Sequence, residues 1–381
     1  MNHRERVLAA LNRREPDRVP MDLGGTLAST VVGPAYARLR SALGLAVQET
    51  RESMRYASLV EIDEDVRVAL DVDIIHAPRA FGSGDQMNIV SENVFVDEWG
   101  IRWRKPEDGH YYVESPPFGN EATAATVERH SWPDPKDLVR VEGLAEKIKS
   151  IRSETDYAIS LELRGRTLSL GQFLRGFGEW MMDLASNGSF VDALMERTTQ
   201  IQLEANELIL KEVGTLVDVV YTADDLGGQN GPLVSPETVR RFFNPHYRRL
   251  WGHIRANTPA KLLHHCCGSI YPFIQDFIDF GVEALNPIQV SASNMDPVRL
   301  KREFGDVLAF WGGIDTRDVM PRGTPQQVRR EVASRISQMA PGGGFVLAAV
   351  HNLQPDVPPA NIVELFRSGG ELGRYPLRSH S

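Results

Sequence analysis

The sequence contains very little cysteine. Its 381 residues include two cysteines, Cys266 and Cys267, which are adjacent. Neighbouring cysteines can form only a strained vicinal disulfide, so a disulfide-stapled secreted fold is excluded. This use of cysteine is typical of a protein in a reducing compartment, and we therefore expect a cytoplasmic location.

Long apolar runs and an excess of positive charge are also absent. No apolar run approaches the roughly 20 residues that a membrane-spanning helix needs. The charged residues 1–6 lack the apolar core of a signal peptide. The net charge is -9, whereas a nucleic-acid-binding domain usually carries a basic face. We therefore expect neither a membrane nor a nucleic acid as a partner.

The glycine motifs that bind phosphate are missing as well. No GxGxxG or GxxxxGK[ST] follows a predicted strand, which disfavours a nucleotide-binding, doubly wound sheet. Strands instead alternate with helices, and the eight predicted strands lie near residues 20, 73, 160, 218, 263, 285, 309 and 347. This alternation predicts an α/β fold with a parallel sheet, and eight units suggest a closed (β/α)8 TIM-like barrel. An open doubly wound sheet is the alternative.

We expect residues 1–381 to form one barrel domain. A helix over residues 3–13 would form an N-terminal extension, because Val7, Leu8 and Leu11 share one helical face. Residues 86–120 alternate polar and apolar side chains and contain several turn residues. This pattern predicts a small antiparallel insertion.

Both cysteines lie in the stretch KLLHHCCG, residues 261–268. Its first residues are typical of a short buried strand, and Gly268 begins a turn. Because side chains alternate along a strand, His265 and Cys267 would share one face. An imidazole and a thiolate on one face at a strand end make half of a zinc site. The alternative is that the cysteines act as small apolar residues beside packed histidines.

Polar residues gather at the predicted carboxyl ends of the strands, where barrel enzymes place their active sites. They are Asp22, His76, Glu162, Asp224, Asp225, His265, Cys267, Asn286, Asp315 and His351. Three of them suit zinc, namely His265, Cys267 and His351. Three protein ligands and one open position are the arrangement of a catalytic zinc ion. The alternative for His351 is a helix-capping or loop histidine.

The remaining polar residues except His76, together with Tyr221 and Gln229, are assigned to catalysis or substrate binding. Asp225 and Glu162 are the catalytic candidates, as carboxylates that bind substrate or move a proton. Six further residues are expected to bind substrate: Asp22, Tyr221, Asp224, Gln229, Asn286 and Asp315. The loop over residues 224–229 has a solvated turn as its alternative. Arg164, Arg166 and Arg175 would hold a substrate carboxylate or phosphate. The alternative is that they are surface or salt-bridge residues.

Several longer stretches together resemble one family. They are RERVLAALNRREPDRVPMDLGG, DDLGGQNGPLVSPETVRRFFNPHYRRL, LLHHCCGSIYPFI, ALNPIQVSASNMDPVRLKREFGDVLAFWGGIDTRDVMPRGTP, GGGFVLAAVHNLQPDVPPANIV and PPANIVELFRSGGELGRYP. Over nearly the whole chain the sequence resembles the uroporphyrinogen decarboxylase superfamily, specifically its cobalamin-linked methyltransferase branch. The resemblance implies a distorted (β/α)8 barrel.

The resemblance also separates the branches of the superfamily. Its decarboxylases carry an arginine-rich N-terminal segment that binds porphyrinogen carboxylates, whereas residues 20–25 here read PMDLGG. Its methyltransferases hold zinc through a His-x-Cys motif and a later cysteine. His265 and Cys267 match the motif, and His351 stands at the later position.

The function that the resemblance implies is methyl transfer between a small substrate and a corrinoid (cobalamin) on a partner protein. With an O-methylated aromatic substrate, zinc would polarise the ether oxygen and cobalt(I) would take the methyl group. With a thiol, zinc would stabilise the thiolate. One cysteine and two histidines favour activation of the leaving group, and hence demethylation. Two alternatives stay open: a metal-free decarboxylase of another carboxylated substrate, and a non-catalytic ligand-binding barrel. The protein could also form a homodimer.

Overall fold

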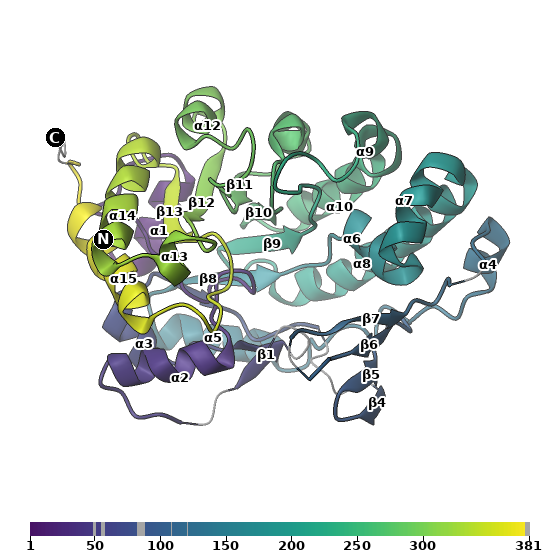
Figure 1. The fold of residues 1–381 in the computed structure, drawn as a ribbon, viewed down its shortest axis with the longest axis horizontal. Coiled ribbons are helices and arrows are strands. Elements are labelled where there is room, and N and C mark those ends of the chain that lie inside the picture. Colours follow the sequence, from purple (N-terminus) through teal and green to yellow (C-terminus); the bar gives the residue numbers. More distant parts are fainter. Residues whose placement is uncertain (49–50, 55–57, 82–87, 108, 120, 378–381) are drawn as a thin grey trace.

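The computed structural model of the protein describes residues 1–48, 51–54, 58–81, 88–107, 109–119 and 121–377. Within these ranges a curled parallel sheet has the strand order β13-β12-β11-β10-β9-β8-β3 (Figure 1). Its strands are β3 (Ile74–His76), β8 (Ala158–Glu162), β9 (Val219–Ala223), β10 (Lys261–His265), β11 (Ala284–Asn286), β12 (Ala309–Ile314) and β13 (Phe345–Ala349).

Residues 20–22 close this sheet into a ring between β13 and β3. Met21 bridges Leu347 in parallel, and the main chain of Leu347 both donates to and accepts from this segment, at 2.9 and 3.0 Å. On the other side Asp73 donates its N–H to the Met21 carbonyl, but the Met21 N–H donates to the Asp73 carboxylate. The eighth predicted strand is therefore reduced to a single bridge. The carboxylate of Asp73, rather than a main-chain carbonyl, accepts the next hydrogen bond. The predicted (β/α)8 barrel is confirmed.

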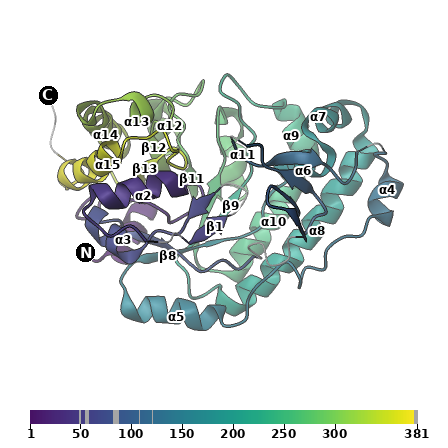
Figure 2. The same ribbon diagram turned by 60° about the horizontal axis from the view of Figure 1, so that its bottom comes forward.

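Helices surround the sheet (Figure 2). They are α2 (Gly33–Ala42), α3 (Glu64–Leu70), α4 (Ala124–Arg129), α5 (Leu144–Glu154), α6 (Leu168–Arg175), α7 (Phe177–Ser186), α8 (Gly188–Val213), α9 (Pro236–Phe242), α10 (Asn244–Asn257), η2 (Tyr271–Phe273), α11 (Ile274–Asp279), α12 (Pro297–Phe304), α13 (Val319–Arg322), α14 (Pro325–Met339) and α15 (Pro359–Leu372). Ser235 caps α9 and Thr324 caps α14, since the side chain of each accepts a main-chain N–H group of its helix.

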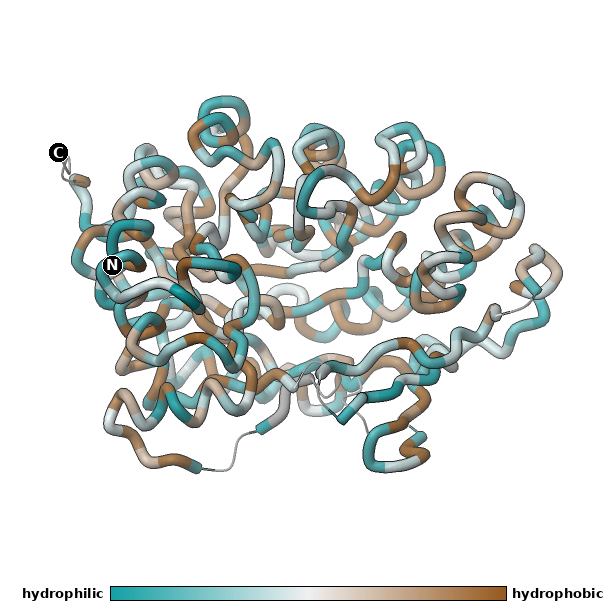
Figure 3. The backbone as a smooth tube through the Cα atoms, in the orientation of Figure 1, coloured by the Kyte–Doolittle hydropathy of each residue, from teal (hydrophilic) through white to brown (hydrophobic). Residues whose placement is uncertain are grey.

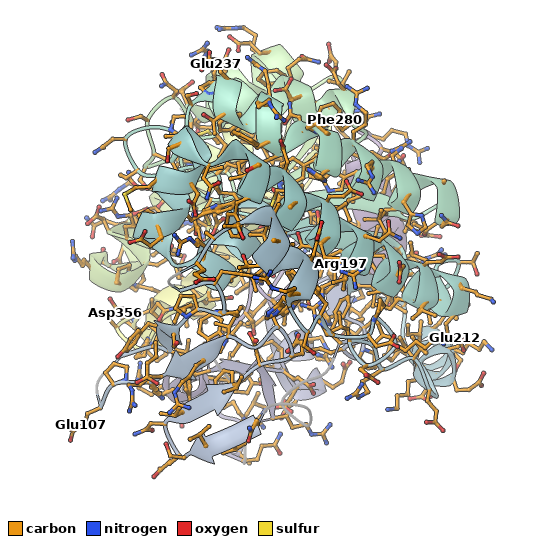
Figure 4. All side chains as sticks on the ribbon, turned by 90° about the vertical axis from the view of Figure 1, so that its right-hand side faces the viewer. Glu107, Arg197, Glu212, Glu237, Phe280 and Asp356 are labelled. Carbon is orange, nitrogen blue, oxygen red and sulfur yellow. The ribbon has the colours of Figure 1, made fainter. Side chains whose placement is uncertain are left out.

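Hydrophobic and hydrophilic residues alternate along the outer helices, as the coloured tube in Figure 3 shows. This pattern is typical of helices that bury one face against a sheet. At the surface of the molecule, the charged side chains of Glu107, Glu212 and Glu237 point outward (Figure 4). No helix in the described ranges is both long and apolar enough to cross a bilayer.

Helix α1 (His3–Leu11) closes the amino-terminal end of the barrel. Its side chains Val7 and Leu11 pack in one buried cluster with the inward-facing residues of the strands, among them Trp311 and Tyr221. Because α1 occupies this end, a ligand can enter the barrel only from the opposite end, where the carboxyl ends of the strands lie.

A buried ion cluster anchors α1. Asp73, with 0% side-chain exposure, accepts hydrogen bonds from Arg6 at 2.6 Å and from Arg18 at 2.7 Å. His3 Nδ1 lies 2.8 Å from the same carboxylate. The cluster links α1, residue 18 and the loop before β3, so it holds together the segments that close the barrel.

A second sheet stands beside the barrel, at the position of the predicted insertion (Figure 1). It is antiparallel, and its strands are β4 (Asn88–Ser91), β5 (Val94–Val96), β6 (Arg102–Arg104) and β7 (Tyr112–Ser115). Residues 86, 87, 108 and 120 of that insertion lie outside the described residues. Strands β1 (Glu52–Met54) and β2 (Leu59–Val60) form a separate pair. The single domain over residues 1–381 stays a prediction.

Candidate metal centre and its cavity

The three predicted zinc ligands meet at the carboxyl end of the barrel. His265 is the last residue of β10, Cys267 follows two positions later, and His351 lies just beyond β13. One ligand atom from each lies within 4.8 Å of the other two. His265 Nε2 is 3.4 Å from Cys267 Sγ, and the two imidazole rings are 5.6 Å apart. Strands β10 and β13 are not neighbours, so closure of the barrel produces this cluster.

The protonation of these groups suits a cation. Burial lowers the pKa of His351 to about 4, so its imidazole is neutral at pH 7 and can donate a lone pair. Burial, and secondly the charge of Asp225, raise the pKa of the Cys267 thiol. Without a cation the sulfur is therefore protonated, and a cation would stabilise the thiolate. One sulfur and two imidazole nitrogens are a donor set that zinc accepts.

Asp225 lies beside the cluster. Its Oδ1 accepts the main-chain N–H of Cys267 at 2.8 Å and is 3.9 Å from His265 Nε2. Burial alone would raise the pKa of Asp225, but His265, the Cys267 N–H, His351 and Arg166 together lower it. The carboxylate is thus ionised and 52% exposed, in reach of a ligand.

A cavity of about 230 Å³ adjoins the cluster and includes His265 and His351 in its wall. Leu27, Leu59 and Phe173 give it an apolar side. Sequence reasoning did not identify these three, because they come from a loop, a two-residue strand and a helix rather than from the ends of barrel strands. A cavity of this size and lining suits a small, partly apolar molecule.

The other side of the cavity is charged. Glu162 and Arg166 line it, and Glu162 forms an ion pair with Arg79 at 3.3 Å. Burial opposes ionisation of Glu162, but Arg79, Arg164 and Arg166 outweigh it and lower the pKa. Glu162 is therefore a partly buried, ionised carboxylate at the end of β8. A positive charge soon after β3 was the sequence signal that could have identified Arg79.

Tyr221 also lines the cavity. Its hydroxyl accepts the Leu27 N–H at 3.1 Å and lies 2.8 Å from His76 Nε2. His76 lies in the wall of a neighbouring cavity of about 510 Å³, and burial lowers its pKa to about 4. The Tyr221–His76 hydrogen bond therefore joins the walls of the two cavities, and Leu27 lines both.

Asp224 and Asn286 reach the site but are held by the protein. Asp224 is 2% exposed and accepts the N–H groups of residues 167–169, with Tyr247 donating its hydroxyl at 2.6 Å. It therefore caps α6. Asp224 also lines the cavity, but its oxygens already accept hydrogen bonds from the protein, so its contact with substrate stays a prediction. Asn286 Oδ1 lies 2.5 Å from His265 Nδ1, which directs this side chain toward a ligand candidate rather than toward the cavity.

Three further residues were expected to bind substrate, but they do not line this cavity. Asp22 accepts hydrogen bonds from Gly25 and Trp311 inside the barrel, where burial raises its pKa to about 6. Asp315 accepts N–H groups from the turn before α13. Gln229 accepts a hydrogen bond from Gln289 at 3.1 Å and joins two rim loops.

The partners of Arg164 and Arg175 show that these two arginines serve the structure. Arg164 pairs with Glu98 of the antiparallel insertion at 2.9 Å and stacks over Phe81. Arg175 pairs with Asp183 at 2.6 Å. The salt-bridge alternative holds for both, and Arg166 is the arginine of this group that lines the cavity.

Comparisons with known proteins agree with this architecture. A solved structure, a methyltransferase from Methanosarcina mazei, has a TM-score of 0.67 at 19% identity and covers 97% of this chain and 99% of its own. At that identity the similarity shows the fold alone. A uroporphyrinogen decarboxylase from Pseudoalteromonas translucida (strain TAC 125) is 39% identical over 61 residues, 16% of this chain and 17% of that protein. The chain therefore matches a small part of that relative's length.

A family match covers far more of the chain. The family described as uroporphyrinogen decarboxylase (URO-D) matches residues 2–371. The barrel, its closed amino-terminal end and its polar carboxyl end all lie within this range. The chain belongs to the uroporphyrinogen decarboxylase (URO-D) family.

Proposed function

We propose that this protein is a zinc-dependent methyltransferase. It would move a methyl group from an O-methylated aromatic compound to a corrinoid cofactor on a partner protein. The observation that carries the proposal is the convergence of His265, Cys267 and His351, with ligand atoms within 4.8 Å, at the open end of the barrel. The shared fold with a methyltransferase supports it.

The cavity residues would bind and orient the substrate. His265, Cys267 and His351 would hold zinc, which when bound supplies a Lewis acid for the ether oxygen. Leu27, Leu59 and Phe173 would pack against a single aromatic ring and exclude water from it.

The two ionised carboxylates, Asp225 and Glu162, would have different roles: one would move a proton and the other would accept a hydrogen bond. Asp225 is next to the ligand cluster and would relay a proton from water to the phenolate oxygen as the methyl group leaves. Glu162, held by Arg79 on the far side of the cavity, would bind a polar group on the ring. The ion pair fixes Glu162 in its charged form, so it would serve as an acceptor.

The corrinoid, carried by its partner protein, would supply the cobalt that accepts the methyl group. The partner would approach the carboxyl ends of the strands, since α1 fills the other end of the barrel. A homodimer and a cytoplasmic location are parts of the same proposal.

Decarboxylation of another carboxylated substrate is the second candidate, favoured by the 61-residue match to a uroporphyrinogen decarboxylase. The N-terminal segment weighs against a porphyrinogen as substrate. Residues 20–25 contain no arginine, and Arg18 is directed to Asp73 at the closed end of the barrel.

The test is a turnover assay with free cob(I)alamin under anaerobic conditions. Zinc-loaded protein is incubated with a panel of single-ring methyl aryl ethers, and loss of cob(I)alamin absorbance and release of phenol are followed together. We expect equal amounts of methylcobalamin and phenol, and none from His351→Ala. Carbon dioxide released from a carboxylated substrate by metal-free protein would instead establish the decarboxylase. Ligand binding without any turnover would establish a binding barrel.

A further inference from the structure

The imidazole of His265 has two nitrogens with different partners. In a neutral imidazole one nitrogen carries a proton and the other carries the lone pair. Only the nitrogen with the lone pair can bind a metal ion, and the partner of the other nitrogen decides which one this is. The side chain next to Nδ1 therefore determines whether Nε2 is available to the cluster.

That neighbour is Asn286 on the adjacent strand. His265 pairs in register with Asn286 across β10 and β11, and Asn286 Oδ1 lies 2.5 Å from His265 Nδ1. Both side chains are buried, with 5% and 1% exposure. Water therefore offers neither group a substitute partner, and the bond between them decides the tautomer.

The amide of Asn286 has a defined orientation. Its nitrogen Nδ2 lies 3.4 Å from the carbonyl oxygen of Trp311, to which it can only donate. Its oxygen consequently faces the imidazole and can only accept, so Nδ1 carries the proton. The reversed amide would oppose two acceptors at Trp311 and would place a proton on His265 Nε2, pointing at Cys267.

Two other groups face His265 Nε2. Cys267 Sγ lies 3.4 Å away, and its thiol can donate to the Nε2 lone pair, so the group that competes for the proton is Asp225. Asp225 Oδ1 is 3.9 Å from His265 Nε2 and would favour a proton there. That distance is too long for a hydrogen bond, whereas the 2.5 Å contact with Asn286 is short. The contact with Asn286 therefore prevails.

We propose that Asn286 is a positioning residue that holds His265 in the Nδ1–H tautomer, so that the Nε2 lone pair faces Cys267 and His351. The consequence for zinc rests on the proposed function, whereas the tautomer itself does not. This assigns to Asn286 a role different from the substrate contact expected from the sequence.

The experiment measures the tautomer of His265 in metal-free protein by 15N NMR of histidine-labelled samples, and zinc affinity by chelator competition. Wild-type protein should show a protonated Nδ1. Asn286→Asp keeps an acceptor and should keep this tautomer and a zinc affinity of the same order. Asn286→Leu removes the acceptor, and we expect it to shift the proton toward Nε2 and to weaken zinc binding by about 10- to 100-fold.

Asn361→Leu is the matched control. Asn361 is also 1% exposed, but it binds the carbonyls of Met320 and Gly323 away from the cluster. Its loss should cost stability without changing the tautomer or zinc affinity. A protonated Nε2 in the wild type, or unchanged zinc affinity in Asn286→Leu, would overturn the inference. Wild-type protein that has the Nδ1–H tautomer but binds no zinc would refute the proposed function and leave the inference standing. If Asn286→Leu does not fold, the wild-type and Asn286→Asp spectra decide.

Discussion

The carboxylate of Asp225 accepts the main-chain N–H of Cys267 at 2.8 Å. An acid that follows β9 thereby fixes the turn that follows β10. The adjacent Cys266 is held through its sulfur instead, which accepts the Leu226 N–H at 3.3 Å. The two thiols thus have different partners, and of the two it is Cys267 that belongs to the ligand cluster.

Substitution of Asp225 separates its charge from its hydrogen bond. Asp225→Asn keeps an acceptor for the Cys267 N–H, so we expect it to retain zinc. It loses the charged group that handles the proton, so turnover should fall by about 100-fold or more. Asp225→Ala should lose turnover and also weaken zinc binding. Zinc content and kcat measured on the same samples test this, and Asp225→Asn with wild-type kcat would contradict the assignment.

Phe173 is expected to bind the aromatic ring of the substrate. It lines the cavity and packs on Trp103 of the antiparallel insertion at 5.2 Å. Phe173→Ala removes apolar contact from a bound ring, so KM for a single-ring ether should rise by about 10-fold. Phe177→Ala, at a residue 59% exposed on the next helix, is the control and should leave KM unchanged. Equal KM values in both variants would exclude Phe173 from the binding site.

Replacement of Asp73 should lower the free energy of unfolding more than replacement of an exposed carboxylate. Its carboxylate is fully buried and binds two arginines. Asp73→Asn leaves Arg6 and Arg18 with only their partly exposed partners Asp17 and Asp71, and should cost about 3–5 kcal/mol. Asp71 also pairs with Arg18, but it is 60% exposed. Asp71→Asn should therefore cost less than about 1 kcal/mol. Urea denaturation measures both, and equal losses would argue against the buried cluster as an anchor.

The same cluster makes stability depend on pH. The hydrogen bond to Asp73 outweighs burial and raises the pKa of His3 above its usual value of 6.5. The proton on His3 thus stabilises the folded state below pH 6.5, and this stabilisation is lost as the pH rises through the folded-state pKa. We expect His3→Ala to lower the free energy of unfolding more at pH 5.5 than at pH 9. A difference that grows with rising pH would have the wrong sign.

The sequence predicted the barrel because strands and helices alternate, and it predicted the ligand cluster because barrel strands end at one rim. Alternation placed His265 and Cys267 on one face, as the structure has them. The first strand was harder to predict, because Met21 donates to a side chain rather than to a neighbouring strand.

Side-chain partners explain the differences within the site. Asp224 and Asn286 were expected to meet substrate from their positions at strand ends. The groups that occupy their oxygens come from α6, α10 and β10, which only the folded chain brings together. Leu27 and Phe173 carry no polar signal, so their place in the cavity depends on the path of a loop and a helix.

Zinc content per chain tests the central claim most directly. We expect wild-type protein and Cys266→Ala to bind about one zinc ion per chain, because Cys266 is fully buried and its sulfur accepts the Leu226 N–H instead of joining the cluster. His265→Ala, Cys267→Ala and His351→Ala should each weaken zinc binding by more than about 100-fold, since even residues that only support a ligand are worth 10- to 100-fold. Wild-type protein that takes up no zinc, or a Cys266→Ala variant that loses as much as Cys267→Ala, would contradict the account.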